Sequence, residues 1–190
     1  MLPKIIPEFA GYDIAAGLIT STEVGGDYYD FFQSNKDELF AVCGDATGHG
    51  TAAGMMVSII KSGLNGLPIL SVNVILEKLN NIVKKIDLGR LRMSLSVLKL
   101  TKEKIEYSAA AMPPFFYYNS KKATCEEILL EGLPLGGLKN ESYTKQSLKM
   151  SEGDTIMVVS DGLPEAENEN KELYDYQRCL LYTSPSPRDR

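Results

Sequence analysis

Histidine and cysteine, the usual ligands and nucleophiles of enzyme sites, are scarce in this chain, and tryptophan is absent. The one histidine, His49, excludes metal sites built from several histidines and leaves any Ser–His or Cys–His mechanism dependent on a single residue. The three cysteines, Cys43, Cys125 and Cys179, are far apart and form no CxxC pair. This pattern favours reduced thiols over a disulfide framework or a zinc site, and it predicts a cytoplasmic protein.

Long apolar runs are also missing. No stretch approaches the roughly 18–20 apolar residues that span a bilayer, and the first nine residues lack a secretory apolar segment. The net charge of −5 argues against nucleic acid as a partner and against binding to an anionic membrane surface. With 190 residues, 44% of them apolar and 24% charged, the composition fits a single globular domain.

The C-terminal stretch differs in character from the rest of the chain. Residues 178–190 contain three arginines and two closely spaced prolines, and they resemble a translated sequencing adaptor more than a protein terminus. We therefore expect a domain over residues 1–177 that is incomplete at its C-terminus, followed by a non-native tail over 178–190. A native disordered tail is the alternative interpretation.

The hydrophobic pattern predicts two helices between two groups of strands. Residues 72–86 carry apolar side chains at i, i+3, i+4 and i+7, with Ser71 as cap and Gly89 at the end, and residues 51–64 are small and apolar nearly all round. Short turns between strands imply antiparallel pairing, so the chain is expected to be α+β rather than a Rossmann alternation. The predicted strands are 11–19, 27–33, 39–43, 93–100, 104–110, 115–118, 125–130, 142–148 and 155–159.

Three aspartates stand beside glycine where predicted strands begin or end. They are Asp27, Asp45 and Asp161, and each can direct its carboxylate toward open space. Oxygen ligands of this kind suit hard divalent cations such as Mg²⁺ or Mn²⁺. An ordinary turn explains one isolated Asp-Gly equally simply, so the aspartates alone leave both interpretations open.

Longer motifs around these aspartates resemble a known family. Residues 44–50 (GDATGHG) and 23–31 (EVGGDYYDF) resemble the stage II sporulation protein E-type branch of the metal-dependent, type 2C-like (PPM) serine/threonine phosphatases. Asp27 and Asp45 stand 18 residues apart, as in the paired metal-binding aspartates of that family. Three further motifs match in order, namely 111–114 (AMPP), 132–136 (GLPLG) and 153–163 (GDTIMVVSDGL).

The resemblance implies a fold, a cofactor and an activity. The fold is two antiparallel β-sheets packed as a sandwich and flanked by helices, and the cofactor is a pair of Mn²⁺ or Mg²⁺ ions. Asp27, Asp45 and the backbone carbonyl of Ala46 would hold the metals, and Asp161 would add a ligand from the other sheet. Water activated by the metals would attack phosphoserine or phosphothreonine in a bacterial signalling protein, possible substrates including an anti-anti-sigma factor. An upstream sensor domain is expected in the full-length protein.

Two departures from the family pattern keep a second interpretation open. The family's final strand carries another metal-binding aspartate, which neither Asp175 nor Asp189 matches, and Ala111-Met112 replaces Gly-His. The alternative function is therefore a non-catalytic binding or switch module with an incomplete metal site. Several further residues are candidates for contacts with the substrate or with the waters around the metals, although turn and loop geometry explains them as well. They are Asp30, Gly48, His49, Gly50 and Gly162.

Overall fold

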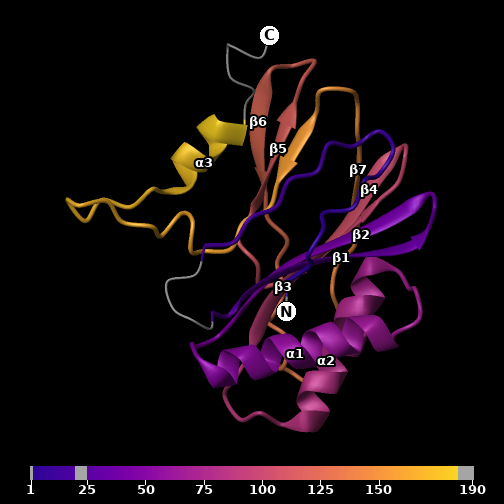
Figure 1. Ribbon diagram of the computed structural model, residues 1–190, viewed down its shortest axis with the longest axis vertical. Helices are drawn as coiled ribbons and strands as arrows, with labels where there is room; N and C mark the ends of the chain where they lie inside the picture. Colours follow the sequence, from indigo (N-terminus) through magenta and orange to yellow (C-terminus); the bar gives the residue numbers. More distant parts are fainter. Residues whose placement is uncertain (1, 20–24, 184–190) are drawn as a thin grey trace. The chain divides into compact units, whose positions relative to one another are not determined.

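The structure is a computed structural model that describes residues 2–19 and 25–183. Glu23 and Val24 of the predicted motif therefore lie outside the described residues. The chain divides into two compact units, Met1–Met112 with Leu130–Lys149, and Pro113–Leu129 with Met150–Arg190. Each unit has its own antiparallel sheet (Figure 1).

The first unit is built on a five-stranded antiparallel sheet. β1 and β2 form a hairpin, in which Phe32 pairs with Phe40 and the two rings stack at a centroid distance of 4.8 Å. β2 then pairs with β3, β3 with β4, and β4 with β7. The strands are β1 (Asp27–Asn35), β2 (Glu38–Ala46), β3 (Met93–Leu100), β4 (Lys104–Ala110) and β7 (Gln146–Lys149).

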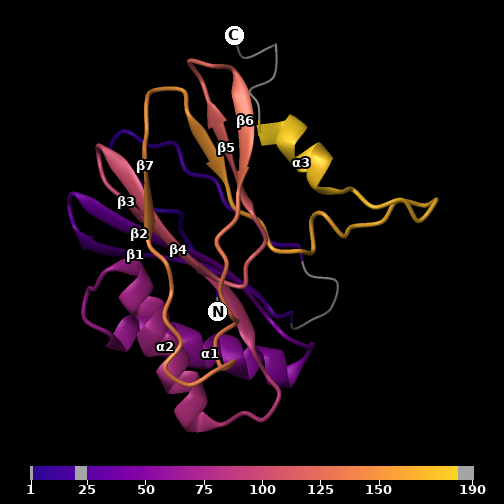
Figure 2. The same cartoon turned by 180° about the vertical axis from the view of Figure 1, so that it is seen from behind.

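Two helices cover one face of this sheet, α1 (Thr51–Gly66) and α2 (Val72–Ile86) (Figure 2). The apolar stripe of α2 is buried in one core with α1 and the sheet. α2 ends at Asp87, whose left-handed backbone (φ 53°) stops the helix two residues before the predicted Gly89. α1 is less buried than its composition predicts, because it has a solvent-facing side on which Met55 is 47% exposed.

The second unit contains a three-stranded antiparallel sheet in the order β6-β5-β8. The strands are β5 (Phe115–Asn119), β6 (Thr124–Ile128) and β8 (Thr155–Met157), and α3 (Tyr176–Thr183) packs on them. Phe116, Val159 and Cys179 form the buried centre of this unit. Residues 178–183 of the predicted non-native tail thus belong to α3, while residues 184–190 lie outside the described part. The non-native origin of the tail stays a prediction.

The predicted fold class is confirmed, because the chain is α+β with two antiparallel sheets and few helices. One predicted strand is wrong. Residues 11–19 form no ladder, and Tyr12 makes an isolated β-bridge with Phe9. Gly11 turns the chain there at φ 89°, and no side chain from 11 to 19 is buried, so the loose alternation of the sequence faces no core. The predicted strand 142–148 is shortened to β7, since Tyr143 enters the core instead.

None of the helices within the described residues is long and apolar enough to cross a membrane.

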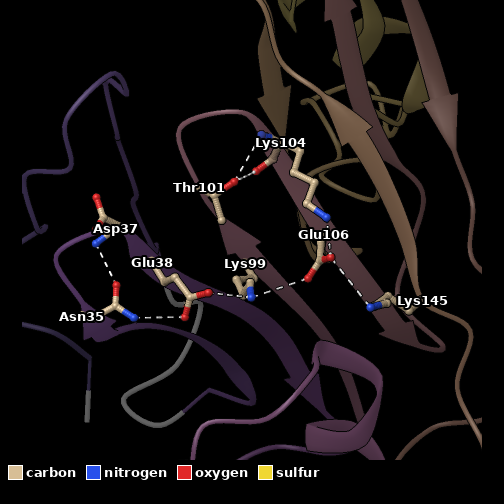
Figure 3. A network of polar contacts seen from close by, with 8 residues as sticks. All are labelled: Asn35, Asp37, Glu38, Lys99, Thr101, Lys104, Glu106 and Lys145. Atoms are coloured by element: carbon tan, nitrogen blue, oxygen red, sulfur yellow. Dashed lines mark hydrogen bonds and ion pairs between the residues drawn. The ribbon is translucent and has the colours of Figure 1, made fainter.

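A group of charged side chains joins β2, β3, β4 and the segment before β7 (Figure 3). Glu106 is its centre, with Lys104 Nζ at 2.8 Å and Lys99 and Lys145 Nζ at 3.7 Å from its carboxylate oxygens. The hydrogen bond from Lys104 is the largest of the effects that lower the pKa of Glu106, and the charges of the three lysines add to it. The hydrogen bond to Glu38 in turn raises the pKa of Lys99.

The lowered pKa of Glu106 predicts a pH-dependent contribution to stability. Glu106→Gln is expected to lower the free energy of unfolding by about 1 kcal/mol at pH 7, because the lysines are partly exposed and screened. The carboxylate stabilises the fold above the ordinary glutamate pKa of about 4.3, and this contribution is lost as the pH falls through the lowered pKa of Glu106.

Urea unfolding of both proteins between pH 7 and pH 3 measures this difference. The exposed Glu103, changed to Gln, is the matched control and should behave as the unmodified protein. A gap between the Glu106→Gln variant and the unmodified protein that stays constant down to pH 3 would contradict the assignment of the effect to the Glu106 charge.

Candidate metal centre

Asp27 and Asp45 lie directly opposite each other across the β1–β2 pair. Asp27 is the first residue of β1, and Asp45 is the last but one of β2. In an antiparallel pair, opposite residues bring their Cβ atoms to within about 4.5–5.5 Å, so two like charges meet here. The hairpin thus brings together two of the three predicted metal-binding aspartates.

Both carboxylates belong to the sheet face that the helices do not cover. Tyr28, Val42 and Ala46 have their side chains in the core with α1 and α2. Because side chains alternate along a strand, Asp27 and Asp45 point the other way. The helices therefore leave these two carboxylates uncovered.

Gly26 brings the backbone of β1 into close contact with the end of β2. Its carbonyl accepts a hydrogen bond from Ala46 N at 3.1 Å. A Cβ atom added at Gly26 would lie 2.3 Å from the Ala46 carbonyl oxygen and 2.8 Å from Asp45 Oδ1. The absence of a side chain at Gly26 therefore lets the Ala46 carbonyl and the Asp45 carboxylate lie next to Asp27.

Gly26→Ala is expected to lower the free energy of unfolding by about 1–3 kcal/mol, because a backbone carbonyl must move to make room for the methyl group. The same movement displaces two of the oxygen atoms of the candidate metal centre, so Mn²⁺ should bind more weakly. Chemical denaturation and calorimetric Mn²⁺ titration measure the two effects.

Gly17→Ala is the matched control for Gly26→Ala, since no atom lies within 4 Å of a Cβ added there and Gly17 has no positive φ. Equal stability and equal Mn²⁺ affinity of the two variants would contradict the role given to Gly26.

The oxygen atoms at this end of the hairpin have the chemistry of a hard-cation site. Asp27 Oδ1 is buried, and none of the residues that the structure describes forms a hydrogen bond with it. The Asp45 carboxylate and the Ala46 carbonyl lie beside it, and carboxylate and carbonyl oxygens are the ligands that Mg²⁺ and Mn²⁺ prefer. A buried, unpaired carboxylate oxygen is costly unless a cation neutralises it. These residues therefore fit a divalent metal.

Burial and the charges of Asp27 and Asp45 contribute to a raised pKa of the neighbouring Cys43 thiol. Burial is the largest cause that raises the pKa of Cys43 to about 12, and the charges of Asp27 and Asp45 raise it further. The thiol therefore stays protonated at neutral pH and is a poor nucleophile.

The loop after β2 is held in place by hydrogen bonds between Thr47 and Arg92, a contact that the sequence motifs did not indicate. Thr47 N donates to Arg92 O at 2.9 Å, and Arg92 N donates to Thr47 Oγ1 at 2.9 Å. Gly48 and Gly50 have positive φ angles of 87° and 70°, and Gly50 is the N-cap of α1. The loop thus runs from the candidate metal centre directly into the N-terminus of a helix, where backbone N–H groups attract anions. His49 is exposed in this loop.

Asp30 lies on the opposite side of β1 from Asp27. Its carboxylate accepts a hydrogen bond from Tyr28 Oη at 2.8 Å and pairs with Lys61 Nζ of α1 at 2.6 Å. Asp30 therefore joins the strand to the helix that covers it. This geometry favours a structural role for Asp30 over a contact with metal-bound water.

Asp161 and Gly162 belong to the second unit and stand in the turn that follows β8. Asp161 is exposed, its carbonyl accepts a hydrogen bond from Glu165 N at 2.9 Å, and its charge adds to the burial that raises the pKa of Tyr176. Within the described parts of the chain, no three His, Cys, Asp or Glu side chains form a cluster suited to a metal.

Comparison with known proteins decides the family. The profile of the family described as Stage II sporulation protein E (SpoIIE) matches residues 35–189. The chain belongs to the SpoIIE family. This confirms the resemblance to the stage II sporulation protein E-type family that was drawn from the sequence motifs.

Individual relatives agree with membership of the SpoIIE family. The phosphoserine phosphatase RsbU of Bacillus subtilis is 28% identical over 174 residues, which cover 90% of this chain and 52% of RsbU. The chain thus spans about half the length of this relative.

Solved structures support the SpoIIE-type fold. The SiaA-PP2C domain of Pseudomonas aeruginosa has a TM-score of 0.68 at 17% identity, covering 83% of this chain and 65% of that chain. RsbX in complex with magnesium has a TM-score of 0.64 at 18% identity, covering 86% of this chain and 82% of that chain.

The positions of Gly26 and Asp30 had a signal in the sequence that the motif alone did not reveal. Gly26 stands before Asp27 in the same motif, and an unexplained glycine beside a ligand candidate points to a close backbone approach. Asp30 is three residues after Asp27, so strand alternation places it on the other face. The Thr47–Arg92 contact joins residues 45 positions apart and had no local signal.

Proposed function

We propose that this chain is a metal-dependent phosphatase domain that removes phosphate from phosphoserine or phosphothreonine in a partner protein. The observation that carries the proposal is the cluster of Asp27, Asp45 and the Ala46 carbonyl, with one buried oxygen of Asp27 unpaired. Similarity to RsbU, named as a phosphoserine phosphatase, supports the reaction, and the magnesium complex of RsbX supports the cation.

The proposed cofactor is a pair of Mn²⁺ or Mg²⁺ ions held by Asp27, Asp45 and the carbonyl of Ala46. Asp161 is proposed as a further ligand on the strength of its motif. Bound divalent ions would lower the pKa of water and neutralise the negative charge of a phosphoryl group. The catalytic aspartates therefore act as ligands rather than as nucleophiles.

The other residues of the loop have supporting parts in this proposal. Gly50 is the N-cap of α1 and Gly48 lies two residues before it, and the backbone N–H groups that this glycine loop exposes at the start of the helix favour the binding of a phosphate group. His49 is exposed and can donate a hydrogen bond to phosphate or protonate a leaving serine oxygen. Gly162 is proposed to contact the substrate beside Asp161. Cys43 is protonated at neutral pH and takes no part as a nucleophile.

The proposed partner is a phosphorylated signalling protein of the bacterial cytoplasm, of the anti-anti-sigma class, and an upstream sensor domain would regulate the reaction. We also propose that the phosphatase domain comprises residues 1–177 and that 178–190 are non-native. Neither nucleic acid nor a membrane is a proposed partner of this domain.

The test is the release of phosphate from a phosphoserine protein with Mn²⁺, before and after removal of metal by a chelator. It is run on this chain and on a version whose C-terminal residues are restored from the gene. The expected result is turnover that stops with chelation and returns with Mn²⁺. Activity that persists after complete metal removal would contradict the mechanism. Metal binding without turnover in both versions would instead favour the non-catalytic switch module.

A further inference from the structure

A hollow of about 590 Å³ opens on the first unit beside α2. This volume lies within the roughly 300–1,000 Å³ typical of ligand sites. Four of its lining residues are lysines, Lys78, Lys84 and Lys85 on α2 and Lys139 on the segment that follows β6. None of its lining residues is acidic, although the whole chain has a net charge of −5.

The four lysines have no acidic partners of their own. Among the residues that the structure describes, none of the four lysines forms an ion pair, and Lys84 Nζ donates a hydrogen bond to the carbonyl of Gly137 at 3.4 Å. Lys78, Lys85 and Lys139 are exposed. Like charges around one concave surface repel each other, and a bound negatively charged group would relieve this repulsion among the lysines.

The rest of the lining is not that of a simple anion site. Leu67 and Ile82 supply apolar surface, and Asn81 and Asn140 supply amides that can both donate and accept hydrogen bonds. A peptide presents these three chemistries together, since it carries charged side chains, apolar side chains and backbone N–H and C=O groups. A free phosphate would use the lysines and the amide N–H groups but would leave the apolar surface of Leu67 and Ile82 without a partner.

We propose that this lysine-lined hollow binds an acidic peptide segment of a partner protein, with acidic side chains at the lysines and an apolar side chain on Leu67 and Ile82. The hollow is lined by residues that take no part in the candidate metal centre. The binding therefore does not depend on catalysis.

The test uses the intact chain and a short fluorescein-labelled peptide of glutamates around a central leucine, followed by fluorescence polarisation. Lys78→Gln combined with Lys85→Gln is expected to weaken binding by about three- to tenfold, because each exposed ion pair contributes modestly. Lys121→Gln combined with Lys122→Gln is the matched control, with the same loss of charge at two exposed lysines of the second unit, and should leave binding unchanged. Binding should also weaken with added salt and when serine replaces the central leucine.

Several results would overturn the proposal. If both double variants weaken peptide binding equally, the effect comes from the net charge of the chain and not from the hollow. If a peptide with glutamines in place of glutamates binds equally well, acidic side chains are not what the hollow recognises. Displacement of the peptide by equimolar inorganic phosphate would make a small anion the occupant. Self-association that is seen in sedimentation and lost in the Lys78→Gln and Lys85→Gln variant would make a second copy of the chain the occupant.

Discussion

Asp45→Asn is expected to lower metal-dependent phosphatase turnover by at least about 100-fold, the effect of removing one electrostatic element from an active site. The substitution keeps the size of the side chain and removes one of two negative charges that lie opposite each other on β1 and β2. A divalent ion at the Ala46 carbonyl would then be held by one carboxylate fewer, and affinity falls with the number of charged ligands.

Stability separates this effect from misfolding. Without metal, Asp45→Asn should melt at the same temperature as the unmodified protein or higher, since like charges directly opposite in a sheet are destabilising. Asp37→Asn is the matched control, because Asp37 is exposed in the turn of the same hairpin and should leave turnover unchanged. Phosphate release is measured at saturating Mn²⁺ on the version of the domain that shows activity. Near-normal turnover of the Asp45→Asn variant would show that Asp45 is not a ligand.

Asn80→Ala is expected to lower the free energy of unfolding by about 2–4 kcal/mol. The Asn80 side chain is fully buried. Its Nδ2 donates to Leu138 O at 2.9 Å, and its Oδ1 accepts from Gly136 N at 2.8 Å. Alanine would leave the buried Gly136 N–H without a partner, would remove the hydrogen bond to Leu138 O, and would also leave a cavity.

The loop that Asn80 holds is connected to the start of β3. Leu135 N donates to Met93 O at 2.8 Å, and Met93 N donates to Leu135 O at 3.2 Å. Chemical denaturation measures the effect of Asn80→Ala. Asn65→Ala is the control, since Asn65 is exposed on α1 and its side chain donates to the carbonyl of Lys61, so its loss should cost less than about 0.5 kcal/mol. Equal stability of the two variants would contradict the role given to Asn80.

Elements with a strong local pattern could be predicted well from the sequence. The bounds of β3 and β4 agree with the predicted 93–100 and 104–110, because β-branched and apolar residues end there at polar turns. α2 was predicted over its observed range, since its apolar residues follow the helical period around the whole segment. The proximity of Asp27 and Asp45 also follows from local information, because the turn of the hairpin sets the register of β1 and β2.

What could not be predicted depends on contacts between distant parts of the chain. Asn80 is 56 residues from Gly136, and nothing in a helical apolar pattern distinguishes a buried asparagine from an exposed one. The segment 11–19 alternates in sequence but gains no ladder, because a strand is stabilised by its neighbours rather than by its own pattern. The pairing of β7 with β4 likewise depends on the path of the long segment before it.

The most direct test of the account is calorimetric titration of Mn²⁺ into the metal-free chain and into its Asp27→Asn variant. Asp27 supplies the buried carboxylate oxygen that has no hydrogen-bond partner in the described part of the chain, and this atom is the reason for placing a cation at the end of the β1–β2 hairpin. We expect Mn²⁺ to bind the unmodified chain and the Asp37→Asn control alike, and to bind Asp27→Asn at least about tenfold more weakly, since the number of charged ligands sets the affinity. Equal Mn²⁺ affinity in all three proteins would contradict the assignment of the metal centre to Asp27.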